Sequence, residues 1–196
     1  MRFVLPVLFL ALWPGMASGD HPGFLPGDRA MFEAHNCYPY NGFWKDRIGR
    51  ALKSPPPIAI EVDLRWQPDQ NGGELIVAHD ETPPGRAPSL REYVFERLRP
   101  EVEAALASED KTHWPLYTLN MNDLRGNAPE MYAALWALAI AHEDWLCTAI
   151  KGDSDEVAPM TRGPVLLLSN GGRQAVQTFY DAVPVGRTLR IFGSGD

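Results

Sequence analysis

Cysteine is scarce in this sequence, which limits the sites and cross-links that the chain can form. Cys37 and Cys147 are its only two cysteines, and two thiolates cannot supply the four ligands of a structural zinc site. A disulfide between them would close a long loop, but it requires the two Cα atoms to lie within about 7 Å of each other. The sequence does not determine that distance, and we favour two free, partly buried thiols.

An excess of positive charge is also missing. The chain has 18 Lys and Arg against 25 Asp and Glu, a formal net charge of −7, so its charge balance does not favour nucleic acid or an anionic membrane. It has no glycine-rich nucleotide loop, and AHEDW at 141–145 lacks the second histidine of a zinc-protease helix. These absences argue against three common classes of site and leave the oligomeric state open.

No apolar run is long enough to span a membrane, because the run at 3–13 is interrupted by Pro6 and falls short of about 20 residues. It follows a basic start and precedes the small residues 17–19, the order of a secretory signal peptide that covers 1–19. We therefore expect a secreted or periplasmic protein with no stable membrane span. Residues 20–196 are expected to form a single domain, since 45% hydrophobic content is sufficient for a folded core.

Apolar or β-branched runs alternate with segments of helical spacing along this domain. Strands are expected at 30–35, 58–66, 74–78, 114–121, 145–150, 164–168 and 188–192. Helices are expected at 43–53, 89–108, 129–142 and 173–182. This alternation predicts an α/β fold with a parallel sheet covered by helices, either an open doubly wound sheet or a barrel. The run at 74–78 follows its predecessor too closely to be parallel to it, so we expect a hairpin.

The strand AIEVDLRW at 59–66 carries charges inside an apolar run. Because side chains alternate across a strand, Glu61, Asp63 and Arg65 share one face, opposite an apolar face. Two buried carboxylates side by side are unfavourable unless a cation holds both, and hard oxygen ligands suit Mg²⁺ or Ca²⁺. The alternative is a pair of exposed acids at a strand end, satisfied by Arg65 or by water.

Two other predicted strands end in a histidine beside a polar residue. His35 and Asn36 follow the first strand, and His79 and Asp80 follow the hairpin strand. Each histidine alone is more often structural than catalytic. Parallel sheets bind their ligands at the carboxyl ends of their strands, so both histidines beside the acidic pair favour a site there.

The order of these motifs resembles that of the phospholipase-C-like phosphodiesterases of the (β/α)8 barrel type. It consists of a strand ending in His-Asn, then an E-x-D strand, a turn and His-Asp. Within that superfamily the pattern is similar to the glycerophosphodiester phosphodiesterase branch and to sphingomyelinases of the spider-venom type. The resemblance extends over residues 31–123 and depends on AHNCYP, IAIEVDLRW and GELIVAHDETP.

The resemblance implies a role for each matching residue. His35 corresponds to the histidine that acts as nucleophile or general base on the phosphodiester, and His79 to the general acid that protonates the leaving alcohol. Glu61 and Asp63 correspond to the metal-binding pair. The implied cofactor is a divalent cation, Mg²⁺ or Ca²⁺, and the implied substrate is a small-molecule or lipid phosphodiester.

The sequence departs from the family in the third parallel strand, LYTLNMND at 116–123. The family has an acidic ligand there with a lysine two residues later, whereas this chain has Asn120 and Asn122. We expect Asn120 to be the third metal ligand, with weaker binding because it adds no charge. Candidate contacts to substrate or phosphate are Asn36, Arg65, Asn122 and Lys151. Arg65 and Lys151 are the candidates for the missing positive charge, and a solvated or helix-pairing role stays open for both.

The chain is short for a complete barrel of this type, which takes about 250 residues. We therefore expect a TIM-type (β/α) barrel that is incomplete, with about six parallel strands plus one hairpin, and truncated at its C-terminus. The predicted function is a secreted, metal-dependent phosphoric diester hydrolase. The alternatives are a degenerate or truncated non-catalytic family member and, less favoured, a hydrolase of another class such as a glycosidase.

Overall fold

The computed structural model describes residues 31–80, 85–125, 128–153 and 159–193. The predicted signal peptide at 1–19 lies outside these ranges. Within them, no helix is long and apolar enough to cross a membrane.

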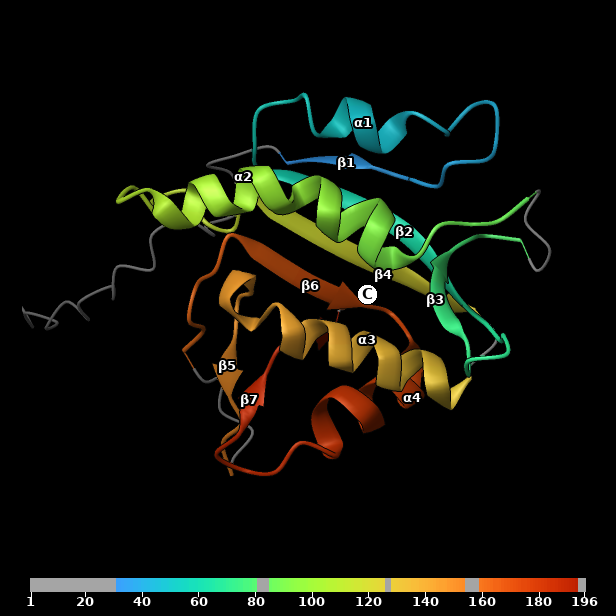
Figure 1. Cartoon of the computed structure of the whole chain (residues 1–196). Helices are drawn as coiled ribbons and strands as arrows, with labels where there is room; N and C mark the ends of the chain where they lie inside the picture. The colour runs from blue at the N-terminus through green and yellow to red at the C-terminus, as the bar shows by residue number, and fades with distance from the viewer. Residues whose placement is uncertain (1–30, 81–84, 126–127, 154–158, 194–196) are drawn as a thin grey trace, which may run out of the picture.

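A six-stranded, mostly parallel sheet forms the centre of the fold (Figure 1). Its order is β1 (Phe32–Ala34), β2 (Ile58–Gln67), β4 (Tyr117–Arg125), β6 (Val165–Ser169) and β8 (Phe192–Gly193). Each of these strands pairs in parallel with the next. The remaining strand, β3 (Glu74–Val77), pairs antiparallel with β2, which confirms the predicted hairpin.

The helices follow the predicted segments with shifted ends. They are α1 (Arg47–Ala51), α2 (Glu96–Ala107), α3 (Pro129–Ala141) and α4 (Gly172–Val176). A wider helical turn, Arg91–Phe95, leads into α2, and another, Gln177–Asp181, continues α4. The Ser89 hydroxyl accepts a hydrogen bond from the Glu92 amide at 3.1 Å, so the serine expected to begin the second helix does so.

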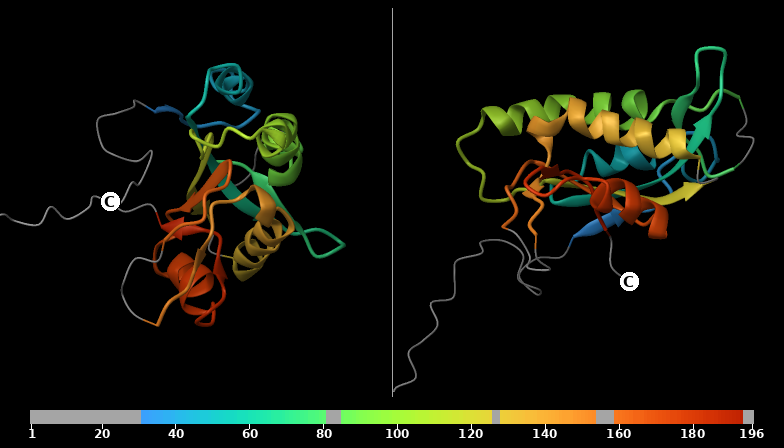
Figure 2. Two further views of the ribbon diagram at one scale, coloured as in Figure 1. Left: turned by 90° about the vertical axis from the view of Figure 1, so that its left-hand side faces the viewer. Right: turned by 90° about the horizontal axis from the view of Figure 1, so that it is seen from below.

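Helices α2 and α3 cover one face of the sheet, as two perpendicular views agree (Figures 1 and 2). The core lies between these helices and the strands, where Leu98 and Leu135 are fully buried together with Ile60 and Leu64 of β2. We call this side the helix-covered face. We call the opposite side, which carries Glu61, Asp63 and Asn120, the polar face.

The expectation of six parallel strands is wrong by one. Residues expected at 145–150 contribute β5 (Ala149–Ile150), which pairs antiparallel with β7 (Thr188–Leu189) in a separate two-stranded sheet. The same segment meets β6 at one parallel bridge, Leu146 to Val165, and β6 pairs directly with β4. The chain passes closely here, because a Cβ at Gly163 would lie 2.3 Å from the Leu146 carbonyl oxygen.

The fold class is therefore mixed α/β with a mostly parallel central sheet. Each parallel strand is added on the same side of its predecessor, and among the described residues β1 and β8 are the two edges of the sheet. This arrangement is compatible with part of an α/β barrel. It does not establish a TIM barrel.

Candidate functional site

The acidic pair of β2 lies on the polar face, and both residues are buried, with exposed fractions of 2% for Glu61 and 3% for Asp63. The alternative of an exposed acidic pair is therefore wrong. Glu61 lies directly beside Asn120 of β4 in the parallel register. The Asn120 amide nitrogen donates a hydrogen bond to a Glu33 carboxylate oxygen of β1 at 3.1 Å. Three neighbouring strands thus contribute oxygen-bearing side chains to one region of the sheet.

The turn after β1 brings the backbone of Asn36 to this region. Asn36 has φ of 57°, a left-handed conformation that asparagine tolerates better than most residues. Its N–H donates to Glu61 Oε2 at 2.5 Å, and the N–H of Cys37 donates to the Glu61 carbonyl at 3.0 Å. Asn36, predicted as a substrate contact, therefore orients Glu61, a predicted metal ligand, through its own backbone.

Burial is the main cause that raises the pKa of Glu61 above its ordinary value. The adjacent Asp63 carboxylate raises that pKa further, while the Asn36 N–H and the nearby His35 lower it. His35 itself is exposed. The site thus holds its glutamate in an environment that disfavours the charged form unless a positive group is present.

His79 reaches the same region through Tyr38. The Ala78 amide donates to the Asp63 carbonyl at 3.0 Å, and the ring centroids of Tyr38 and His79 lie 5.9 Å apart. Asp63 is in turn among the charges that raise the pKa of Tyr38 to about 12, after burial, which is the largest cause. His79 Nδ1 lies 2.9 Å from Asp80 Oδ1. Backbone and ring contacts therefore place the His79 segment beside Asp63 and Tyr38.

A bulge in β4 changes which residues of that strand face the site. Glu61 pairs with Asn120, but Asp63 pairs with Asp123 and Arg65 with Arg125, one residue further than strict alternation gives. Asn122, predicted as a substrate contact, is thus not the residue in register beside Asp63. The side chain of Arg125 is brought in instead, with Nη2 4.0 Å from Asp63 Oδ2.

Three arginines contact residues of this region, and one of them was predicted from the sequence. Arg65 donates from Nε and Nη2 to the His79 carbonyl at 3.1 and 3.0 Å, and Arg47 donates to the His35 carbonyl at 2.6 Å. Arg65 was predicted as a phosphate contact. Arg47 and Arg125 were missed, because neither a half-buried arginine in a short helix nor a residue beyond a bulge has a distinctive sequence signal.

Lys151 is engaged elsewhere. Its Nζ donates to the backbone carbonyls of Tyr180 and Asp181 at 2.7 and 3.2 Å and lies 4.5 Å from the centre of the Tyr180 ring. The prediction that Lys151 supplies the missing positive charge of the site therefore has no geometric support. Arg125 is the better candidate for that charge.

The side-chain oxygens of this region are of the kind that a hard cation prefers as ligands. Glu61 and Asp63 offer carboxylate oxygens, and Asn120 Oδ1 is buried with no hydrogen-bond partner in the described part of the chain. A bound cation would explain why this Asn120 oxygen, beside two carboxylates, has no hydrogen-bond partner. Across the described ranges, however, no group of three or more His, Cys, Asp or Glu is arranged to hold a metal ion. The fit therefore depends on the asparagine as third ligand.

The two cysteines are free and buried, as we favoured from the sequence. Burial raises the pKa of the Cys37 thiol to about 12, and Glu61 adds to the rise. Cys37 is therefore an inert core residue beneath the site and not a nucleophile.

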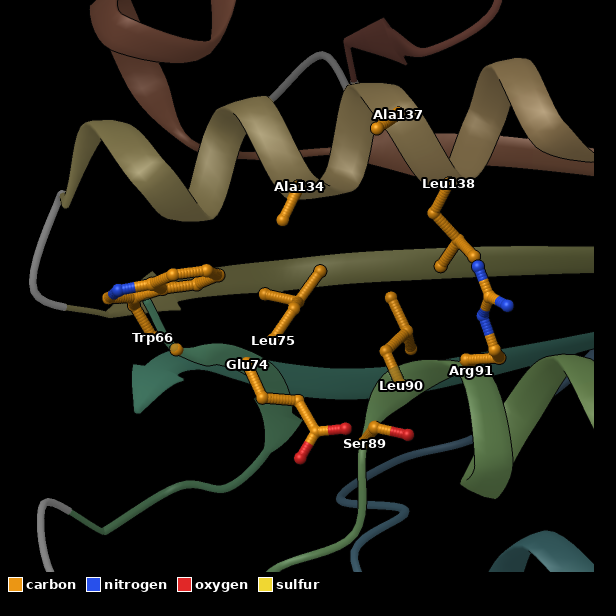
Figure 3. Close-up of a pocket in the computed structure, with 10 residues that line it drawn as sticks. Trp66, Glu74, Leu75, Ser89, Leu90, Arg91, Ala134, Ala137 and Leu138 are labelled. Carbon is orange, nitrogen blue, oxygen red and sulfur yellow. The ribbon is translucent and has the colours of Figure 1, made fainter. Parts of the chain in front are cut away.

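A cavity of about 310 Å³ lies on another side of β2, between the hairpin, α3 and the turn before α2 (Figure 3). Trp66 forms one end, Leu75 and Leu90 lie along it, and Ala134 and Leu138 of α3 face them. A second cavity of about 340 Å³ lies between α4 and β8. Neither cavity is lined by a predicted catalytic or metal-binding residue.

Comparison of the chain with protein-family models, curated proteins and solved structures returns no match. The resemblance to the phospholipase-C-like phosphodiesterases therefore stays a prediction from the motifs.

Proposed function

We propose that this protein is an exported, divalent-cation-dependent phosphodiesterase that acts on glycerophosphodiesters or phospholipids. We also propose that its open sheet is part of a TIM-type (β/α) barrel, a reading supported by parallel strands added in order and helices gathered on one face. The observation that carries the proposed activity is the buried pair Glu61 and Asp63 beside the unsatisfied Oδ1 of Asn120.

In this proposal Glu61, Asp63 and Asn120 hold the cation, Mg²⁺ or Ca²⁺. When bound, the cation neutralises negative charge on the phosphoryl oxygens. His35 attacks phosphorus or takes the proton of the attacking hydroxyl, and His79 gives a proton to the leaving alcohol. Arg125 adds a fixed positive charge close to Asp63.

Hydrolysis of glycerophosphocholine, lysophospholipid and bis-nitrophenyl phosphate tests the activity, each with Mg²⁺, Ca²⁺ or a chelator. We expect cation-dependent turnover, and losses of at least about 100-fold in His35→Ala and His79→Ala, the usual contribution of acid–base groups. His113→Ala is the matched control, since His113 is an exposed histidine outside the site. Turnover that survives both site substitutions contradicts the mechanism, and its absence with every substrate favours the non-catalytic alternative.

Cation binding is tested separately from turnover by thermal unfolding. Mg²⁺ or Ca²⁺ at 100 times its Kd would stabilise the folded chain by about 2.7 kcal/mol. Asn120→Asp supplies the carboxylate that the family has at this position, and we expect it to tighten cation binding by about tenfold or more. Asn71→Asp is the control, because Asn71 is an exposed asparagine in the turn between β2 and β3. Equal gains in both variants would contradict the assignment of Asn120.

A further inference from the structure

His79 is held in an unusual way for a residue at a strand end. The last pair of the β2 and β3 ladder is Leu64 with Val77, and one further amide, that of Ala78, bonds back to β2. Beyond that point the sheet no longer fixes the peptide groups. Two side chains take over, because the His79 N–H donates to Tyr40 Oη at 2.5 Å and its carbonyl accepts from Arg65 at 3.1 and 3.0 Å.

Tyr40 connects the two histidine-bearing segments. It lies five residues after His35 in the loop that leaves β1, and its ring stacks on Tyr38 with centroids 5.3 Å apart. Tyr38 also contacts the His79 ring at 5.9 Å. Burial raises the pKa of Tyr40, and the backbone amides of His79 and Asp80 partly offset this rise. The phenol oxygen accepts from the His79 amide.

Asp80 determines which imidazole nitrogen remains available. Its Oδ1 lies 2.9 Å from His79 Nδ1, so Nε2 is the nitrogen left to meet a substrate. With both backbone groups and Nδ1 engaged, the imidazole has few orientations open to it. Such support is what an acid–base group needs in order to meet the reacting atom at a fixed geometry.

We propose that Tyr40 and Arg65 are positioning residues that fix the His79 peptide, so that its imidazole presents Nε2 to the polar face. This inference rests on the proposed function only for the role of His79 in hydrolysis. It reassigns Arg65 from phosphate contact to support of the second histidine. It also ties the loop after His35 to the geometry of His79.

Tyr40→Phe in the full chain tests the first contact. It removes one oxygen and should leave the His79 amide unpaired, so we expect amide exchange of His79 to rise at least tenfold. The ¹⁵N chemical shifts of the His79 ring should move as well. Tyr93→Phe is the matched control, because the Tyr93 hydroxyl is buried without a hydrogen-bond partner in the described part of the chain. It makes the same chemical change and should leave His79 unaltered.

Arg65→Lys tests the second contact and serves if Tyr40→Phe does not fold. Lysine keeps the charge but cannot bond the carbonyl with two nitrogens, so the His79 ring shifts should move in the same direction. Arg86→Lys is its control, on an exposed arginine that pairs with Glu74 at 3.5 Å. Where the chain hydrolyses a diester, both site variants should lower kcat about tenfold with little change in KM.

The outcomes separate this inference from the proposed function. Unchanged ring shifts and amide exchange in both site variants overturn the positioning role, even where His79→Ala abolishes hydrolysis. Altered shifts and exchange in both, with controls unchanged, support it, even in a chain that hydrolyses nothing. A change of equal size in Tyr93→Phe also overturns it, because a general loosening would then explain the result.

Discussion

The two faces of β2 are buried to nearly the same extent but are built from opposite kinds of residue. On the helix-covered face Ile60, Val62 and Leu64 are at most 1% exposed, and on the polar face Glu61 and Asp63 are 2% and 3% exposed. The apolar residues gain free energy from burial, whereas buried carboxylates lose hydration that their neighbours replace only in part. One face of β2 therefore increases the stability of the fold, and the other lowers it.

The difference shows that burial by itself does not identify the core. Buried carboxylates need hydrogen bonds or positive charge in place of their hydration; the Asn36 N–H donates one such bond to Glu61, and Arg125 Nη2 lies 4.0 Å from Asp63 Oδ2. Features that lower stability and still fit the fold in detail are expected at functional sites. Predictions that treat the two faces separately follow from this contrast.

Leu64→Ala should have the largest effect on stability. Leu64 is fully buried under the helices, so truncation leaves a cavity and should lower the free energy of unfolding by about 3 kcal/mol. Urea denaturation followed by circular dichroism measures the change. Leu106→Ala, at a partly buried position on the rim of the same core, should cost clearly less. Similar losses in both variants would show that the helix-covered face is not tightly packed.

Glu61→Gln should have an intermediate effect of opposite sign. The raised pKa of Glu61 means that the folded state holds its proton more tightly than the unfolded state. This contribution favours folding below the ordinary glutamate pKa and is lost as pH rises through the folded pKa. Glutamine keeps an acceptor for the Asn36 N–H without the charge, so it should stabilise the chain near pH 7 by on the order of 1 kcal/mol.

The pH dependence distinguishes this cause from others. In the presence of chelator, the advantage of Glu61→Gln should shrink as pH falls towards the ordinary range of a glutamate, and urea titrations at several pH values would follow it. Glu109→Gln, at an exposed position, should show no such trend. An advantage that is constant with pH would mean that the charge of Glu61 is not what costs stability.

Much of the site could be predicted from the sequence, because period-two alternation fixes the faces of a regular strand. Glu61 and Asp63 are on one face for that reason, and the short spacing to Glu74 required the hairpin that carries His79. The period-two alternation does not hold along β4. The bulge opposite Glu61 and Asp63 inserts one residue, so Asp123 and not Asn122 is in register beside Asp63, and Arg125 Nη2 comes within 4.0 Å of Asp63 Oδ2.

The C-terminal strands were harder to predict for a different reason. The run at 145–150 is apolar enough for a buried strand, but its partner is chosen by tertiary contacts at Gly163 and Val165 that leave no local pattern. The expected strand at 188–192 divides between β7 and β8, which belong to different sheets. Local patterns predicted that these segments are extended, but not what they pair with.

Asn120→Leu should change stability by less than about 1 kcal/mol in the absence of cation. The substitution removes a buried acceptor without a partner, which is favourable, and the hydrogen bond to Glu33, which is unfavourable. Any stabilisation by Mg²⁺ or Ca²⁺ should be lost, as thermal unfolding with and without cation would show. Retained stabilisation would mean that the carboxylates bind the cation without Asn120.

Thr118→Val should have the smallest effect and marks where the site ends on the polar face. Thr118 precedes Asn120 by two residues and pairs with Ala59 in register, and within the described ranges its hydroxyl donates to the Met31 sulfur at 3.8 Å. A thioether is a weak acceptor, so valine, which has nearly the same shape, should change the free energy of unfolding by less than about 0.5 kcal/mol. Cation-dependent stabilisation should not change. A loss above about 1 kcal/mol would extend the polar network towards the amino ends of the strands, and the contrast between the faces would then hold along all of β2.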